Sequence, residues 1–258
     1  MNIFYLTLII LACGIVGYLF GSINFALIIC KMKGIDIYKV GSGNAGGTNV
    51  GRALGKKYAF LTIFLDVLKT LIPMWSIFFI FNYTSCGLYV DSLVKNFPVE
   101  ILYYTAGLCA GIGHKWPIYY KFKGGKAVSC FGGFIVATNW LFAVIGLSFF
   151  LLVFAIKKRV SIASILSVIM MFTVSLIVVF FPIPTGFSSS WILGSWFFSD
   201  GLQIVNSYIY SIYLLVFGFF VILFHKSNIK RIIKKEEPET HYRHKGDDAL
   251  PDSVKIKK

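Results

Sequence analysis

The feature that most constrains this chain is a series of long apolar segments separated by shorter polar ones. Apolar residues make up 57% of the 258 residues and charged residues only 14%. Apolar runs of about 20 residues are typical of transmembrane helices. We therefore expect an all-α polytopic membrane protein rather than a soluble globular domain.

The apolar segments predict seven membrane spans. The stretch at 127–156 is too long for one crossing, and its Gly132-Gly133 and Thr138-Asn139 pairs predict a short helix, a turn and a second helix. The first segment has no basic region before it and no convincing cleavage site, so we expect a retained helix and not a signal peptide. The spans are expected at about residues 3–30, 58–81, 100–113, the two parts of 127–156, 161–181 and 204–224.

The basic residues predict the orientation of these spans. The formal net charge is +14, and 23 of the 25 Lys and Arg lie in the segments 31–57, 114–126, 157–160 and the tail from residue 225. Cytoplasmic loops of membrane proteins collect Lys and Arg. We therefore expect an outside N-terminus and a cytoplasmic C-terminus, with no nucleic-acid partner. We expect one membrane-embedded domain at 1–237 and a flexible polar tail at 238–258.

A glycine-rich stretch, GSGNAGGTN at residues 41–49, lies in the first basic loop. Glycines let backbone N–H groups turn inward and form a concave anion site. The stretch matches GxGxxG, but that pattern indicates a dinucleotide site only inside a βαβ unit, and here membrane spans flank it. A flexible surface loop is the alternative. The candidate phosphate-binding residues are Gly41, Ser42, Gly43, Asn44, Thr48, Asn49 and Arg52.

A second glycine motif, KGGK at residues 123–126, directly precedes an apolar helix. Backbone N–H groups at a helix start, with lysines around them, can bind an anion. The alternative is a cytoplasmic anchor, which we favour for Lys115 and Lys121. His114 could contact a phosphate or simply cap a helix. The candidates here are His114, Lys123, Gly124, Gly125 and Lys126.

Two weaker motifs follow. Ser161 and Ser164 are three residues apart and share one helix face, although such serines often bond back to their own helix. His225, Asn228 and Arg231 recur every third residue at the start of the tail, where a solvated helix is the alternative. The five cysteines have no CxxC spacing, and we expect no metal or cofactor.

Charged residues also occur inside the second predicted span. Asp66 and Lys69 are one helical turn apart. Charges inside a membrane are costly unless they are paired. We expect a structural ion pair, or a support for the first glycine loop, rather than a proton relay.

Taken in this order, the motifs resemble those of the bacterial acyl-phosphate-dependent glycerol-3-phosphate acyltransferases. The resemblance covers about residues 21–237 and includes GSGNAGGTNVGR, LDVLK, GHKWPIYYKFKGGKAV, RVSIASI and HKSNIKRIIKKEE. It implies a seven-helix enzyme of the bacterial plasma membrane with its active site on the cytoplasmic side. It also implies transfer of a fatty acyl group from acyl phosphate to glycerol 3-phosphate. The product would be lysophosphatidic acid, in the first step of phospholipid synthesis.

The resemblance also assigns roles to residues. It implies catalytic roles for His225, Asn228, Ser161, Arg52 and Lys126, and phosphate-binding or substrate-binding roles for Ser164, Glu237 and the candidates of the two glycine motifs. Its implied partners are the two substrates and membrane lipids, and we expect a monomer. The chain departs from the family pattern where Gly47 replaces Ala, Asn24 replaces Pro, and Ala127 and Lys235 replace Gly.

The chemistry of an acyl phosphate needs no enzyme nucleophile, because phosphate is a good leaving group. Arg52 and Lys126 would supply fixed positive charge, and the proton would pass to His225 or, as we favour, to a substrate phosphate. No His is followed five residues later by Asp, which excludes the HxxxxD acyltransferase class. A small transporter or flippase for an anionic solute is the alternative function, but it would place polar groups at mid-membrane. A scaffold without activity does not account for the motifs.

Overall fold

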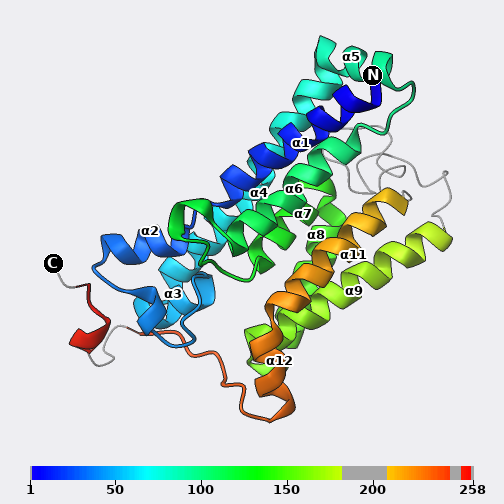
Figure 1. The fold of residues 1–258 in the computed structure, drawn as a ribbon. Coiled ribbons are helices and arrows are strands. Elements are labelled where there is room, and N and C mark those ends of the chain that lie inside the picture. The colour runs from blue at the N-terminus through cyan, green and yellow to red at the C-terminus, as the bar shows by residue number, and fades with distance from the viewer. Residues whose placement is uncertain (1, 182–207, 245–250, 257–258) are drawn as a thin grey trace.

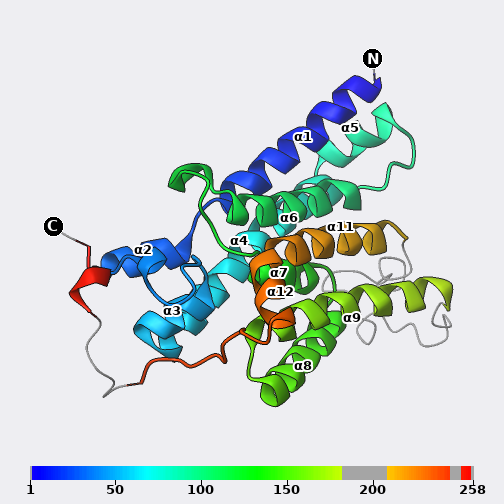
Figure 2. The same cartoon turned by 60° about the horizontal axis from the view of Figure 1, so that its bottom comes forward.

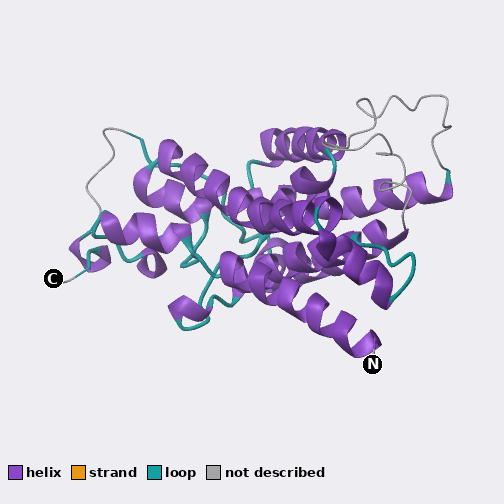
Figure 3. Ribbon diagram, turned by 90° about the horizontal axis from the view of Figure 1, so that it is seen from above, coloured by secondary structure: helices purple, strands orange, loops and turns teal. Residues whose placement is uncertain are grey.

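The computed structural model describes residues 2–181, 208–244 and 251–256. The predicted loop at 182–203 and the first residues of the last predicted span, 204–207, lie outside the described residues. Within the described part all regular elements are helices (Figure 3). One isolated antiparallel bridge joins Ile35 and Lys255. The predicted all-α class is confirmed.

The longest helices form the body of the molecule, with shorter ones at its ends (Figure 1). Six of them are α1 (Asn2–Gly21), α4 (Lys56–Tyr83), α6 (Glu100–Lys115), α8 (Trp140–Lys157), α9 (Val160–Phe180) and α11 (Tyr208–Phe224). The shorter ones are α2 (Phe25–Met32), α3 (Gly47–Leu54), α5 (Ser85–Leu93), α7 (Val128–Thr138) and α12 (Lys226–Ile233), with 3-10 turns η1 (Ile37–Lys39), η2 (Ile118–Tyr120) and η4 (Asp252–Val254). Helices α2, α3 and α12 lie at the end opposite α5 and the N-terminus.

Several of these helices are long and apolar enough to cross a membrane. Among the described residues four segments qualify: 2–32, α4, α8 and α9. A fifth is added if α11 and α12, which are bent by 62°, are counted as one broken span. Helices α6 and α7 have 16 and 11 residues, fewer than the roughly 20 of a simple crossing. The membrane class is therefore supported, with four to five clear spans.

Two asparagines set helix boundaries. The predicted division of 127–156 is confirmed, because α7 ends at Thr138 and Asn139 starts α8, its side chain accepting a hydrogen bond from the Phe142 N–H at 2.8 Å. The segment predicted as one span at 3–30 contains a break before α2. There the Asn24 side chain accepts from the Leu27 N–H at 3.0 Å. Asparagine is a favoured N-cap because its side chain satisfies a free N–H of the first turn.

Glycines bring α1 and α6 into close contact. A Cβ added at Gly17 would lie 2.0 Å from the backbone oxygen of Ala106, and one at Gly21 would lie 2.1 Å from that of Ala110. Small residues that let backbones approach are typical of helix pairs in membranes, where dispersion and polar contacts replace the hydrophobic driving force. This pair fixes the end of α6 that carries His114.

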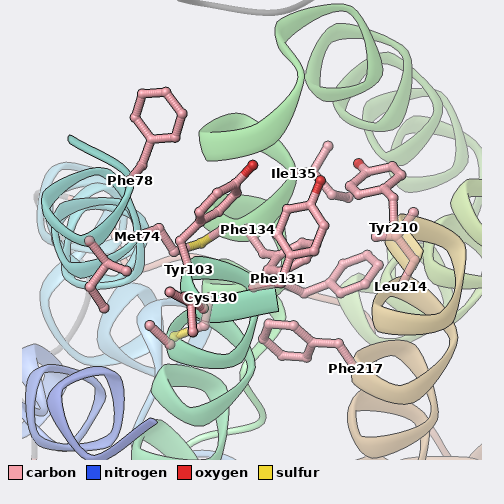
Figure 4. Close-up of a cluster of buried hydrophobic side chains, with 14 of the residues drawn as sticks. Met74, Phe78, Tyr103, Cys130, Phe131, Phe134, Ile135, Tyr210, Leu214 and Phe217 are labelled. Carbon is pink, nitrogen blue, oxygen red and sulfur yellow. The ribbon is translucent and has the colours of Figure 1, made fainter. Parts of the chain in front are cut away.

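The main apolar cluster joins α4, α6, α7 and α11 (Figure 4). Phe134 of α7 is fully buried, with its ring centroid 5.4 Å from that of Tyr104 and 5.8 Å from that of Phe217. Offset and edge-to-face aromatic contacts of this kind add to the stability gained by burial. The cluster holds α7, and so holds the second glycine motif, which directly precedes it.

Candidate active site

The first glycine loop requires its glycines and is fixed by one buried side chain. Gly41 and Gly43 have φ of +50° and +64°, which favour glycine. Asn49, only 1% exposed, donates from Nδ2 to the carbonyl oxygens of Ile37 at 3.1 Å and Val40 at 2.9 Å. Its Oδ1 accepts from the Ser42 N–H at 3.1 Å. Asn49 thus supports the loop from beneath.

The second glycine motif packs against the end of α6. The Gly125 N–H donates to the His114 carbonyl oxygen at 3.0 Å. A Cβ at Gly125 would lie 2.1 Å from His114 Nε2, so that only glycine fits there. The Tyr38 hydroxyl donates to the Lys123 carbonyl oxygen at 2.7 Å. This bond joins the second motif to the segment that leads into the first.

A buried charge cluster lies behind the second motif. Lys69 Nζ is 2.8 Å from Asp66 Oδ1, which gives the expected ion pair. The same ammonium lies 2.8 Å from His114 Nδ1 and donates to the Ile23 carbonyl oxygen at 2.7 Å. These contacts connect the break after α1 with α4 and α6. His114 therefore acts within the scaffold and does not line the pocket described next.

Both glycine motifs open onto one pocket of about 380 Å³. The first motif contributes Ser42, Gly43 and Asn44, and the second contributes Lys123, Gly124 and Lys126. The remaining lining residues are Tyr38, Lys115, Trp116, Phe122, Phe224, Ser227 and Arg231. Four cationic side chains and several backbone amides around one pocket suit a phosphate group.

A buried carboxylate organises the C-terminal motif. Glu237 Oε1 accepts from the Ser161 hydroxyl at 2.5 Å and from Asn228 Nδ2 at 2.7 Å, and Oε2 accepts from Arg231 Nε at 2.7 Å. Burial opposes ionisation, but these hydrogen bonds hold the pKa of Glu237 below its ordinary value. The carboxylate thus ties the start of α9 to α12 and orients Arg231 toward the pocket.

Lys126 and His225 are two further titratable groups at the site. Lys126 Nζ donates to Asn228 Oδ1 at 2.5 Å, and burial lowers the pKa of Lys126 to about 8. His225 Nδ1 lies 2.7 Å from the Val221 carbonyl oxygen, which can only accept, so Nδ1 carries the proton and Nε2 keeps its lone pair. Burial lowers the pKa of His225 to about 4, so its ring is neutral at pH 7.

Eleven predicted site residues lie outside the pocket lining: Gly41, Thr48, Asn49, Arg52, His114, Gly125, Ser161, Ser164, His225, Asn228 and Glu237. Ser164 donates to the Val160 carbonyl oxygen of its own helix at 2.8 Å. The Thr48 side chain has a polar interaction with the Tyr242 hydroxyl. Arg52 is half-buried behind the first loop, where a Cβ added at Gly41 would lie 2.9 Å from its Cδ.

Sequence reasoning missed part of the lining. Lys115, interpreted as an anchor, lies in the pocket wall with Nζ 5.3 Å from the centre of the Phe224 ring. Tyr38 and Phe122, which also line the pocket, were not among the predicted site residues. Among the residues that the structure describes, no group of three or more His, Cys, Asp and Glu side chains could hold a metal ion.

The described residues form a helical membrane protein with a pocket lined by four cationic side chains. A family model described as glycerol-3-phosphate acyltransferase matches residues 11–235. The chain belongs to the glycerol-3-phosphate acyltransferase family.

Similar proteins cover nearly the whole chain. The glycerol-3-phosphate acyltransferase of Mycoplasma capricolum subsp. capricolum is 36% identical over 92% of this chain and 94% of the relative. That of Aquifex aeolicus is 35% identical over 86% and 95%. The fold also matches crystal structures of PlsY, an integral membrane glycerol 3-phosphate acyltransferase, in its glycerol 3-phosphate and lysophosphatidic acid forms. The TM-score is 0.65 and the sequence identity 32%, and the match covers 89% of this chain and 94% of PlsY.

Proposed function

We propose that this protein transfers a fatty acyl group from acyl phosphate to glycerol 3-phosphate. The products are lysophosphatidic acid and inorganic phosphate. The observation that carries the proposal is the single pocket shared by both glycine motifs, because the reaction joins two phosphate-bearing substrates. The names of the relatives support the acceptor, and the resemblance of the motifs supports the donor.

The reaction is a direct displacement. The glycerol hydroxyl oxygen forms a bond to the acyl carbon, and the bond from that carbon to the phosphate oxygen breaks. The hydroxyl proton leaves for a nearby acceptor, and the phosphate departs with the bonding electron pair. Lys126 and Arg231, in the pocket wall, stabilise the charge on the phosphates, and Arg52 adds charge behind the first loop.

The proton acceptor is a substrate phosphate rather than His225. A general base works best when its pKa is near the working pH, and the pKa of His225 lies at about 4. A phosphate monoester has a second pKa of about 6, which suits the task better. His225 Nε2 instead accepts a hydrogen bond from the substrate and orients it.

Glu237 and Asn228 are positioning residues in this scheme. A carboxylate repels a phosphate, so Glu237 acts through Arg231 and Asn228, which it holds by hydrogen bonds. Asn228 in turn accepts from Lys126. Ser161 completes the set by donating to the same carboxylate.

We place the protein in the bacterial plasma membrane as a monomer with seven spans. Helices α6 and α7 then cross with the support of neighbouring helices and polar ends. The basic segment that contains α3 and the described part of the tail beyond α12 lie at the end opposite the N-terminus, which supports a cytoplasmic site. The acyl chain stays among the helices while the phosphates react at the membrane surface.

The test is a donor comparison with purified protein in detergent. The protein is given radiolabelled glycerol 3-phosphate with either acyl phosphate or acyl-CoA, and lysophosphatidic acid is quantified. We expect product with acyl phosphate and none with acyl-CoA. Product with acyl-CoA but not with acyl phosphate would overturn the donor assignment. No product with either donor would overturn the proposed acyltransferase activity.

A further inference from the structure

The segment after Glu237 makes contacts that the mechanism above does not use. The family model ends at residue 235, so this segment lies beyond it. Its described parts leave α12, lie along α3 and end beside α2 (Figures 1 and 2). The sequence indicated no such contacts for residues 238–258.

The segment is first held at the start of α9. The Thr240 N–H donates to the Lys158 carbonyl oxygen at 2.8 Å, and the Thr240 hydroxyl accepts from the Val160 N–H at 3.3 Å. These bonds satisfy backbone groups at the junction of α8 and α9, one residue before Ser161. The chain is therefore fixed before it reaches α3.

The segment then packs on α3 through Tyr242. The N–H of Arg243 donates to the Gly51 carbonyl oxygen at 3.0 Å. The Tyr242 ring lies on Gly51, where an added Cβ would be 2.3 Å from the ring Cδ1. The Tyr242 hydroxyl also has a polar interaction with the Thr48 side chain. Positions 48, 51 and 52 share one face of a helix, so Tyr242 covers the face that carries Arg52.

Arg52 is enclosed between this tyrosine and the first glycine loop. Its guanidinium interacts electrostatically with the Tyr242 hydroxyl and with the Glu237 carboxylate. On the loop side, its Cδ lies so close to Gly41 that a Cβ there would be 2.9 Å away. An arginine held in this way loses less conformational entropy when it meets a phosphate.

A second part of the tail supports the base of the same loop. Val254 is buried with Ile35, Ile37 and Val40, and its carbonyl oxygen accepts from the Asp36 N–H at 2.8 Å. Ile37 is also an acceptor for Asn49, which fixes the loop. Both described parts of the tail therefore contact segments that hold the first glycine motif in place.

We propose that Tyr242 is a positioning residue for acyl transfer, which fixes α3 so that Arg52 and the first glycine loop hold a substrate phosphate. This inference rests on the proposed function. The ring packs on Gly51 and the hydroxyl interacts with Thr48, so the two contributions can be separated by substitution.

The experiment compares full-length Tyr242→Ala, Tyr242→Phe and His241→Ala, the last being an exposed neighbour in the same segment. We expect Tyr242→Ala to raise KM for one of the two phosphate substrates about tenfold while kcat changes less than about threefold. Tyr242→Phe, which keeps the ring, raises the same KM only about twofold, and His241→Ala changes neither constant. Arg52→Ala raises KM for the same substrate, and adding Tyr242→Ala to it has no further effect.

Other results would overturn the inference. A fall in kcat with both KM values unchanged in Tyr242→Ala would show a loss of folded protein only. Additive effects in the double variant would show that Tyr242 does not act through Arg52. Affinity for inorganic phosphate, measured by calorimetry, decides the matter even if the wild type forms no lysophosphatidic acid. Equal affinity in Tyr242→Ala and His241→Ala would then reject the positioning role independently of the proposed function.

Discussion

Lys126 donates a 2.5 Å hydrogen bond to Asn228, although 102 residues separate them in the chain. The contact joins the second glycine motif, which precedes α7, to α12. Asn228 is itself held by Glu237, which also binds Ser161 and Arg231. Three of the four sequence motifs therefore meet in one hydrogen-bonded set beside the pocket.

Activity should fall at alkaline pH because Lys126 loses its charge. Burial lowers the pKa of Lys126 to about 8, so the ammonium form prevails below that pH and disappears above it. We expect kcat/KM, which reports the free enzyme, to decline as pH rises through about 8. Lys126→Arg keeps its charge throughout this range, and its remaining activity should lack this decline. An unchanged alkaline limb in Lys126→Arg would assign the limb to another group.

Replacing His225 should leave the acid side of the pH profile unchanged. Its pKa of about 4 keeps the ring neutral throughout the range near pH 6, where the substrate phosphate titrates. We expect a kcat/KM limb near pH 6 in both the wild type and His225→Gln, with kcat lowered less than about a hundredfold. Loss of that limb in the variant would identify His225 as the base.

Glu237→Gln should reduce activity through its partners. The amide can still accept from Ser161 and Asn228, but its NH₂ group faces Arg231 Nε and cannot accept that bond. We expect kcat/KM to fall about tenfold or more, since charge-assisted bonds are the stronger ones. The exposed neighbour Glu236 provides the matched control, and Glu236→Gln should behave like the wild type. Equal kinetics in the two variants would remove Glu237 from the site.

Lys235→Gly should stabilise the protein. Lys235 has φ of +60°, a left-handed conformation that costs a non-glycine residue about 1 kcal/mol, partly offset by the greater freedom of glycine in the unfolded chain. We expect thermal unfolding in detergent to shift upward by about 1 to 3 °C. Lys234, with φ of −77°, is the control, and Lys234→Gly should lower the midpoint. A lower midpoint for Lys235→Gly would show that the lysine side chain stabilises the fold.

Local signals predicted much of the fold. A turn was expected near the Thr138-Asn139 pair because the apolar stretch is too long for one crossing, and Asn139 caps α8. Ala127 and Lys235, which stand where relatives were expected to have Gly, both adopt positive φ. The sequence did not predict the break before α2, because the apolar character continues through Asn24.

The site was predictable where its residues fall in local motifs. Ser42, Gly43 and Asn44 belong to one such motif and Lys123, Gly124 and Lys126 to another, and all six line the pocket. Tyr38 and Tyr242 were not predicted, because their partners lie 85 and 194 positions away and leave no local pattern. The sequence indicated His114 as a possible phosphate contact or helix cap. Only the fold brings Lys69 of another helix against its ring, and so shows that His114 supports the second motif from behind.

In the proposed reaction the second glycine motif binds phosphate for acyl transfer, and Lys126 supplies its positive charge. The most direct test measures the initial rate of lysophosphatidic acid formation from acyl phosphate by Lys126→Ala beside Lys121→Ala. Lys121 is an exposed lysine of the same loop that does not line the pocket. We expect a loss of about a hundredfold or more in kcat/KM for Lys126→Ala and a change within about twofold for Lys121→Ala. Wild-type turnover in a folded Lys126→Ala variant would contradict this assignment.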